Sequence, residues 1–159
     1  QLQRISNVGT APMGHGSAPS AQLSRNQQFS LLKVSRPRLI SFERRTMITQ
    51  IRPSELETWL KGARALGEPV VLDVREVDEV RIASIKADGF ELITIPMGVI
   101  PPRLNELDPD QPVACLCHHG ARSMSVAAYL AREGFESVAN ITGGIAAWAV
   151  ERDPSVPQY

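Results

Sequence analysis

The feature that most constrains this chain is a series of short apolar runs separated by helix-like stretches. The runs are VVLDV (70–74), ELITIP (91–96), VACLC (113–117) and SVANI (137–141). Apolar runs of this length, rich in β-branched residues, are typical of strands that a sheet buries on both faces. The helix-like stretches lie at 76–85, 101–107, 122–134 and 144–152. Strands that alternate with helices predict an α/β fold, in which helices cover both faces of a parallel sheet.

The helices carry local signals of their own. In the segment 52–67, Ser54 is followed three residues later by Glu57, which predicts a capping box at the start of a helix. That helix should end near Gly67. For the helix at 122–134, spacings of three and four residues predict the apolar stripe that faces the sheet: Met124, Ala127, Ala128 and Ala131.

Charge divides the chain at Met47. The first 46 residues contain seven Lys or Arg and one acid, Glu43, whereas the remainder contains ten basic and sixteen acidic residues. An acidic folded part argues against nucleic acid as a partner, because phosphate binding needs a basic surface. No uninterrupted apolar run reaches the roughly 18 residues needed to cross a bilayer, so we expect no membrane partner either.

One folded domain preceded by an extension of different character is therefore expected. Residues 1–46 mix Gly, Ser, Pro, Gln, Asn and Arg without helical or strand periodicity, and we expect them to be a disordered or non-native extension. Their Arg-rich, acid-poor composition also fits an organelle transit peptide. Residues 47–159 contain 113 positions with all the predicted strands, which is enough for one packed domain.

The stretch ACLCHHGARS (114–123) concentrates the reactive side chains. Its two cysteines, Cys115 and Cys117, are too close together for a loop-closing disulfide, so a reducing cytoplasm is expected. Cys117 ends a predicted strand and a helix starts just after it, which is where open α/β sheets bind ligands. Unpaired amides at a helix start favour a thiolate over a thiol. Gly120 permits a tight turn and Arg122 adds a positive charge, so the pattern predicts a nucleophilic sulfur beside an anionic substrate.

Three motifs in this chain resemble those of the rhodanese (sulfurtransferase) domain family. CHHGARS (117–123) resembles the family's active-site loop: Cys, two variable residues, Gly, one variable residue, Arg and Ser. VLDVRE (71–76) resembles its Asp-Val-Arg motif, and NITGGIAAW (140–148) resembles its Gly-Gly-x-x-x-Trp motif. The resemblance covers 47–159 and is greatest to small single-domain bacterial members. It departs at 81–98, where most members carry a Gly-His-Ile-Pro-Gly-Ala-like segment.

The resemblance implies a rhodanese-like sheet of about five strands and a sulfurtransferase. Cys117 would take a sulfane sulfur from thiosulfate or a similar small anionic donor, hold it as a persulfide, and pass it to a thiol, cyanide or protein acceptor. Asp73 and Arg75 would support the loop, and Arg122 would orient the donor. No metal or organic cofactor is implied. The substrate-binding residues implied are His118, His119, Gly120, Ala121, Arg122 and Ser123.

Other functions of the same loop remain alternatives. A delivery or interaction module would hand sulfur to a partner protein with little small-molecule turnover. Cysteine phosphatases of related fold have five residues between Cys and Arg, whereas four separate Cys117 from Arg122, which leaves less room for a phosphoryl group. A zinc site would need Cys115, Cys117, His118 and His119 to converge, which ligands so close along the chain can hardly do.

Individual residues also have simpler explanations. Cys115 is expected to pack in the core, with a role in resolving the persulfide as the alternative. His118 and His119 are expected to shape the entrance rather than to act as acids or bases. Asp73 is either a turn or helix cap or one partner of a supporting ion pair, and Arg75 could be a surface charge.

Overall fold

A five-stranded parallel sheet forms the centre of the domain. The computed structural model describes residues 47–159, and the predictions for 1–46 lie outside these residues. The strands occur in the order β1-β5-β4-β2-β3, and every neighbouring pair is parallel. They are β1 (Thr49–Ile51), β2 (Val70–Asp73), β3 (Glu91–Thr94), β4 (Val113–Leu116) and β5 (Val138–Ile141). The predicted α/β fold with a parallel sheet is confirmed.

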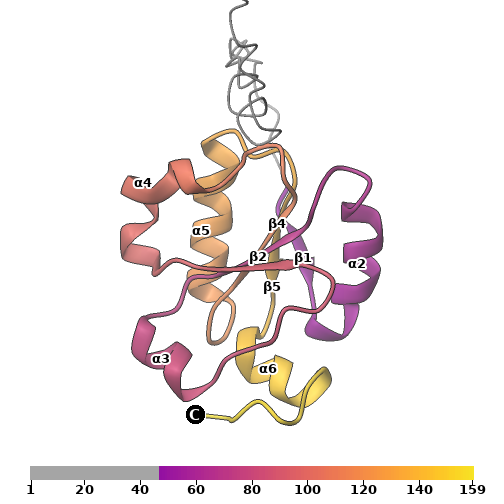
Figure 1. Ribbon diagram of the computed structural model, residues 1–159, viewed down its shortest axis with the longest axis vertical. Coiled ribbons are helices and arrows are strands. Elements are labelled where there is room, and N and C mark those ends of the chain that lie inside the picture. Colours follow the sequence, from indigo (N-terminus) through magenta and orange to yellow (C-terminus); the bar gives the residue numbers. More distant parts are fainter. Residues whose placement is uncertain (1–46) are drawn as a thin grey trace, which may run out of the picture. The chain divides into compact units, whose positions relative to one another are not determined.

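Helices cover both faces of this sheet (Figure 1). One face packs against α2 (Leu56–Ala63) and α6 (Gly144–Glu151), and the other against α4 (Ile100–Arg103) and α5 (Ala121–Arg132). The short helix α3 (Val77–Ile82) follows β2. Three 3-10 turns complete the order: η1 (Pro53–Glu55), η2 (Met97–Val99) and η3 (Leu104–Glu106).

Side chains along the central strands alternate between the two faces, as they must on a pleated sheet. In β4, Ala114 and Leu116 join the hydrophobic cluster beneath α2 and α6. Cys115 joins the cluster beneath α5, and so does Cys117, the first residue after the strand. Both thiols therefore lie on the α5 side of the sheet.

The first helix begins differently from the prediction. The predicted capping box at Ser54 and Glu57 is wrong, because the helix starts earlier, as the 3-10 turn η1 with Pro53 in its first position. The Glu55 carboxylate accepts a hydrogen bond from the Arg52 amide at 2.8 Å, while the Ser54 hydroxyl donates to Glu151 at 3.2 Å. A proline with its fixed φ suits the first turn of a helix, and this sets the start.

The predicted apolar stripe of α5 is also wrong in its phase. Met124 is 38% exposed, and the buried residues of α5 are Ser123, Val126, Ala127 and Leu130. Alanines occur on several sides of this helix and cannot define the buried one. The larger Val126 and Leu130 side chains define it, together with Ser123, whose hydroxyl contacts two buried side chains.

Two further findings complete the fold. The edge strand β1 was not among the predicted runs, since it has only three residues and two of them are exposed. Within the described residues, every helix falls short of the length and apolar character that a membrane crossing would need.

Substitutions in α5 test the corrected phase. Leu130→Ala should lower the free energy of unfolding by about 2–5 kcal/mol, because it opens a cavity in a fully buried position. Met124→Ala should cost no more than about 1 kcal/mol, the average for point mutations. Urea denaturation of both variants measures the difference. Equal losses would contradict the assignment of the buried face.

Candidate active site

Cys117 lies at the carboxyl end of β4, at the base of a tight loop that leads into α5. Its sulfur accepts hydrogen bonds from the Gly120 amide at 3.1 Å and from the Ser123 hydroxyl at 3.2 Å. Only 1% of the residue is exposed. The sulfur is therefore largely shielded from solvent.

The two cysteines differ in their ionisation. Burial by itself would raise the pKa of the Cys117 thiol, but hydrogen bonds from the Ser123 hydroxyl and from the amides of Ser123, Gly120 and His119 outweigh it, so the pKa is lowered. Cys115 is fully buried, and this burial raises the pKa of its thiol well above the ordinary value. Of the two sulfurs, Cys117 is the one with thiolate character.

The loop lies between the amino termini of two helices. The Gly120 amide at the start of α5 points at the Cys117 sulfur. From the first turn of α6, the Ile145 amide donates to the Cys117 carbonyl at 2.9 Å and the Ala146 amide donates to the His118 carbonyl at 3.2 Å. Both helix starts present N–H groups and partial positive charge, which favours an anion within the loop.

Two glycines allow this close approach. Gly120 has φ +102°, and a Cβ there would lie 3.1 Å from the Gly143 nitrogen. Gly144 has φ +56°, and a Cβ there would lie 2.3 Å from the carbonyl oxygens of both Cys117 and His118. The Gly-Gly pair at the start of α6 therefore leaves the space that the Cys117 loop occupies.

Arg122 does not point into an empty anion site. Its terminal nitrogens donate to both carboxylate oxygens of Glu79 in α3, at 2.7 and 2.5 Å. The bond to Arg122 is the main reason that the pKa of Glu79 falls to about 2, and Glu79 in turn raises the pKa of Arg122. The Arg122 side chain is 36% exposed and lies beside the loop, and the Glu79 carboxylate offsets its positive charge.

Asp73 and Arg75 form a buried ion pair. Arg75 is fully buried and donates to the Asp73 carboxylate through Nε at 2.9 Å and through its second terminal nitrogen at 2.6 Å. Its other terminal nitrogen donates to the Ala83 carbonyl at 3.0 Å and to the Tyr159 hydroxyl at 2.9 Å. These bonds hold α3 and Tyr159 in place. Since Glu79 of α3 binds Arg122, the pair can influence the position of the loop through these two residues. The interpretation of Arg75 as a surface charge is wrong.

The histidines form part of an aromatic stack. The His118 ring lies between His119 and Tyr159, with centroid distances of 4.0 and 4.3 Å and nearly parallel planes. Burial lowers the pKa of His118, and the neighbouring charge of His119 lowers it further. The role of the two histidines in shaping the entrance of the loop stays a prediction.

Ser123 connects the sulfur to residues further from the loop. Its hydroxyl oxygen lies 2.7 Å from Oδ1 of Asn140 in β5, and the Asn140 amide donates to Gln50 Oε1 in β1 at 2.9 Å. Ser123 is fully buried and Asn140 is 3% exposed, while Gln50 is on the surface. Four elements therefore contribute to one line of polar side chains that ends at the Cys117 sulfur.

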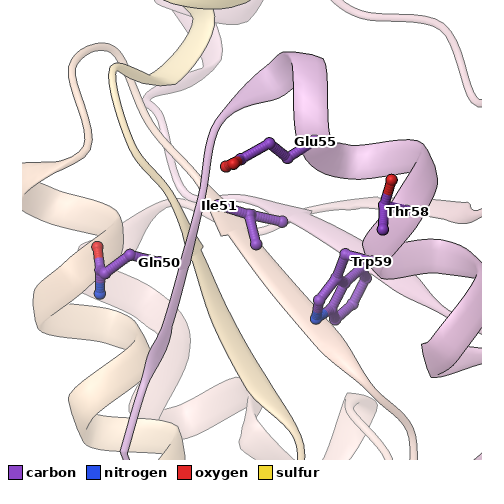
Figure 2. A pocket seen from close by; sticks show the side chains of 5 residues that line it. All are labelled: Gln50, Ile51, Glu55, Thr58 and Trp59. Carbon is purple, nitrogen blue, oxygen red and sulfur yellow. The ribbon is translucent and has the colours of Figure 1, made fainter.

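An open pocket lies elsewhere on the domain. Its volume is about 370 Å³, and its lining comes from β1, η1 and α2. Figure 2 shows the Gln50 side chain on one side of β1, with Ile51 and Trp59 on the other. The lining residues are Gln50, Ile51, Glu55, Thr58 and Trp59. The pocket shares no residue with the Cys117 loop. Within residues 47–159, no group of three or more His, Cys, Asp or Glu side chains is placed to hold a metal ion.

Four residues of this site were not predicted from the sequence. Glu79 was one of several acids in a helix-like stretch, and Tyr159 and Gln50 carry no pattern that points to Cys117. Asn140 stood within a motif but had no role there. A contact between side chains 17, 43 or 90 residues apart follows from the order of the strands, which local sequence patterns do not reveal.

Comparison with known proteins agrees with the fold. Residues 55–151 match the family model described as the rhodanese-like domain. The chain is 38% identical over 117 residues to "Rhodanese-like/PpiC domain-containing protein 12, chloroplastic" of Arabidopsis thaliana, a match that covers 72% of this chain and 38% of that protein. It thus corresponds to well under half of the plant relative's length.

A smaller relative and a solved structure match more of their own length. The "Putative sulfurtransferase YtwF" of Bacillus subtilis (strain 168) is 39% identical over 89 residues, which cover 55% of this chain and 80% of that protein. The crystal structure of a rhodanese-like domain protein from Staphylococcus aureus superposes with a TM-score of 0.54 at 29% identity, covering 70% of this chain and 99% of that one.

The contact between α6 and the loop is tested by a pair of glycine variants. Gly144→Ala should destabilise the domain by about 1–3 kcal/mol from backbone strain alone, and displacing the Cys117 and His118 carbonyls adds to this. Gly62→Ala in α2, where a Cβ meets nothing within 4 Å, should stabilise it by about 0.5–1 kcal/mol. Thermal and urea unfolding measure both. A neutral Gly144→Ala would contradict the close approach.

The buried ion pair is tested against an exposed one. Asp73→Ala leaves the fully buried Arg75 without its carboxylate, and we expect a loss of about 3–5 kcal/mol in the free energy of unfolding. Asp78→Ala breaks the exposed pair with Arg81 and should change stability little. Comparable urea midpoints for the two variants would show that the Asp73–Arg75 pair does not stabilise the domain.

Proposed function

The chain belongs to the rhodanese-like domain family, and on that premise we propose that it is a sulfurtransferase that carries a sulfane sulfur as a persulfide on Cys117. One observation carries the proposal: the Cys117 sulfur accepts bonds from an amide and a hydroxyl at the base of its loop, and its pKa is lowered. A thiolate, rather than a thiol, is the nucleophile in sulfur exchange. The putative sulfurtransferase among the relatives supports the same chemistry.

The proposed reaction has two sulfur-exchange steps. With thiosulfate as donor, the Cys117 thiolate attacks the outer sulfur, a new S–S bond forms, and the S–S bond of thiosulfate breaks so that sulfite leaves with the electron pair. The acceptor, a thiol, cyanide or a protein thiol, then attacks the outer sulfur of the persulfide. Its S–S bond breaks and the Cys117 thiolate is regenerated. No net oxidant or reductant is required.

The loop supplies the binding groups for both steps. The amides of residues 118–123 would bind the negative charge that moves between Cys117 and the bound sulfur. Arg122 would orient the donor with the guanidinium N–H groups that Glu79 leaves free, since a guanidinium has five. The Glu79 carboxylate offsets the positive charge of Arg122. Binding of the anionic donor would therefore depend more on the backbone amides of the loop than on the net charge around it.

The surroundings of the sulfur favour a small or slender donor. With 1% of Cys117 exposed, a reactant that presents a single terminal sulfur fits the opening of the loop better than a broad one. We propose that residues 47–159 form the sulfur-transferring domain. Both cysteines are free thiols, and we propose a reducing compartment, the cytoplasm, as the setting in which Cys117 stays available.

Intact-mass analysis after treatment with thiosulfate tests the function. The protein should gain one sulfur atom, roughly 32 mass units, and peptide mapping should assign it to Cys117. Cyanide should then remove the added mass and yield thiocyanate. Cys117→Ser should gain nothing, whereas Cys115→Ser, the matched control two residues away, should still gain it.

Two results would reject the proposal. The first is an added sulfur that maps to Cys115 in the wild-type protein. The second is a protein that turns over phosphate esters but takes up no sulfur from any sulfane donor, which would favour the phosphatase alternative. If thiosulfate loads Cys117 but only a protein thiol unloads it quickly, a delivery module describes the chain better than an enzyme for small acceptors.

A further inference from the structure

A line of hydrogen-bonded polar side chains ends at the buried sulfur of Cys117. It runs from Cys117 after β4, through Ser123 in α5 and Asn140 in β5, to Gln50 in the edge strand β1. Gln50 lies on the α5 side of β1, away from Ile51 and Trp59 (Figure 2). The line therefore connects Gln50 on the surface with the Cys117 sulfur through two buried side chains, Asn140 and Ser123.

The Ser123 hydroxyl has more acceptors than protons. Its oxygen lies 3.2 Å from the Cys117 sulfur and 2.7 Å from Asn140 Oδ1, and both atoms are acceptors when the sulfur is a thiolate. A serine hydroxyl carries a single proton. If Asn140 Oδ1 takes this proton, the thiolate loses a donor, so the orientation of the Asn140 amide decides which atom is stabilised.

Two arrangements complete the bonds from Cys117 to Gln50, but the second gives up the bonds that the Gln50 amide nitrogen donates to the Ile48 carbonyl at 3.4 Å and to the Met124 sulfur at 3.2 Å. In the first, the Cys117 thiol donates to Ser123, Ser123 donates to Asn140 Oδ1, Asn140 donates to Gln50 Oε1, and the Gln50 amide nitrogen faces the Ile48 carbonyl. In the second, each bond is reversed: Gln50 donates to Asn140 Oδ1, Asn140 donates to the Ser123 oxygen, and Ser123 donates to the Cys117 thiolate. The reversal needs two amide turns and one hydroxyl rotation, with no movement of the backbone.

We propose that Asn140, held by Gln50, is a positioning residue that directs the Ser123 proton either to itself or to the Cys117 sulfur. The thiol favours the first arrangement and the thiolate favours the second, so the line of side chains responds to the ionisation of Cys117 and adjusts its stability. The proposal rests on the proposed function only in taking Cys117 as the nucleophile. It assigns a role to Asn140 in the NITGGIAAW motif and to an exposed glutamine in β1.

The other groups near Cys117 are held by partners of their own. Arg122 is paired with Glu79, and Asp73 with Arg75. The remaining titratable groups around the loop are His118, His119, Tyr159 and Cys115. The hydrogen bonds of Gln50 go to Asn140, the Ile48 carbonyl and the Met124 sulfur, and to none of these groups. The hydrogen-bonded route from Gln50 to the sulfur therefore runs through Asn140 and Ser123, beside the effect of any new charge.

Substitutions at Gln50 can fix the direction in which the hydrogen bonds between Gln50, Asn140 and Ser123 are donated. Gln50→Glu offers only acceptors, so Asn140 must donate to it and present Oδ1 to Ser123. Gln50→Lys offers only donors, so Asn140 must accept from it and turn its NH₂ toward Ser123. We expect the apparent pKa of Cys117 to rise in the first variant and to fall in the second, by roughly half to one pH unit each, the worth of one neutral hydrogen bond. Gln50 is on the surface, so both variants should fold.

The measurement is the rate of Cys117 alkylation by iodoacetamide as a function of pH, followed by mass spectrometry. Each variant is made in the wild-type and in the Ser123→Ala background. A new charge at position 50 acts on the sulfur in both backgrounds, whereas the effect through Asn140 needs the Ser123 hydroxyl. The proposal predicts that most of both shifts disappears with Ser123→Ala.

Asn140→Asp provides a second, independent variant. A carboxylate can only accept hydrogen bonds, so the Ser123 hydroxyl should donate to it rather than to the sulfur. The apparent pKa of Cys117 should rise more than in Gln50→Glu, and the difference between the two variants should disappear in the Ser123→Ala background. Shifts of equal size in the two backgrounds, for either position, would show a simple effect of charge and overturn the proposal. Because alkylation needs no sulfur donor, a protein that shows these shifts but never takes up sulfur would reject the proposed function and leave this inference standing.

Discussion

The site depends on one constraint, that backbone amides from two helix starts converge on Cys117, the residue that follows β4. The sulfur of Cys117 is buried, and burial opposes its ionisation. The Gly120 amide and the Ser123 hydroxyl point at the sulfur and lower the pKa of its thiol, and these donors are in place because α5 starts immediately after the loop. The first turn of α6 binds the loop carbonyls from the other side, and Gly144 leaves no side chain in the way.

The charged residues around this loop act mainly on each other. Arg75 neutralises Asp73 in the interior and bonds to α3 and to Tyr159, and Glu79 of α3 binds Arg122 next to the loop. Neither Arg75 nor Arg122 is therefore an unpaired cation. A site of this kind favours an anion through directed N–H groups, which act at short range, rather than through a broad positive potential. That distinction fits an acidic domain that we propose to handle an anionic donor.

Much of the fold could be predicted from periodicity. Apolar runs predicted β2 to β5, and the helix-like stretches between them predicted α3, α5 and α6 close to their observed bounds. The failures have local causes. The strand β1 has too few buried residues to form an apolar run, the start of η1 depends on Pro53 rather than on Ser54, and small alanines on several sides of α5 conceal which side is buried.

Local sequence was enough to predict the residue types and the order of the motifs: a cysteine at a strand end, a glycine that allows the turn, a helix that follows, and a Gly-Gly pair before the last helix. Such features depend on residues close together in the chain, so their spacing carries the information. The contacts between distant residues follow from the fold: Glu79 binds both terminal nitrogens of Arg122, Tyr159 stacks on His118, and Gln50 and Asn140 reach the sulfur through Ser123. The strand order β1-β5-β4-β2 places β5 and β2 on the two sides of β4, so that β1 and β5 bring in Gln50 and Asn140, and the helix after β2 brings in Glu79. Hydrogen bonds between these side chains depend on that arrangement rather than on sequence spacing.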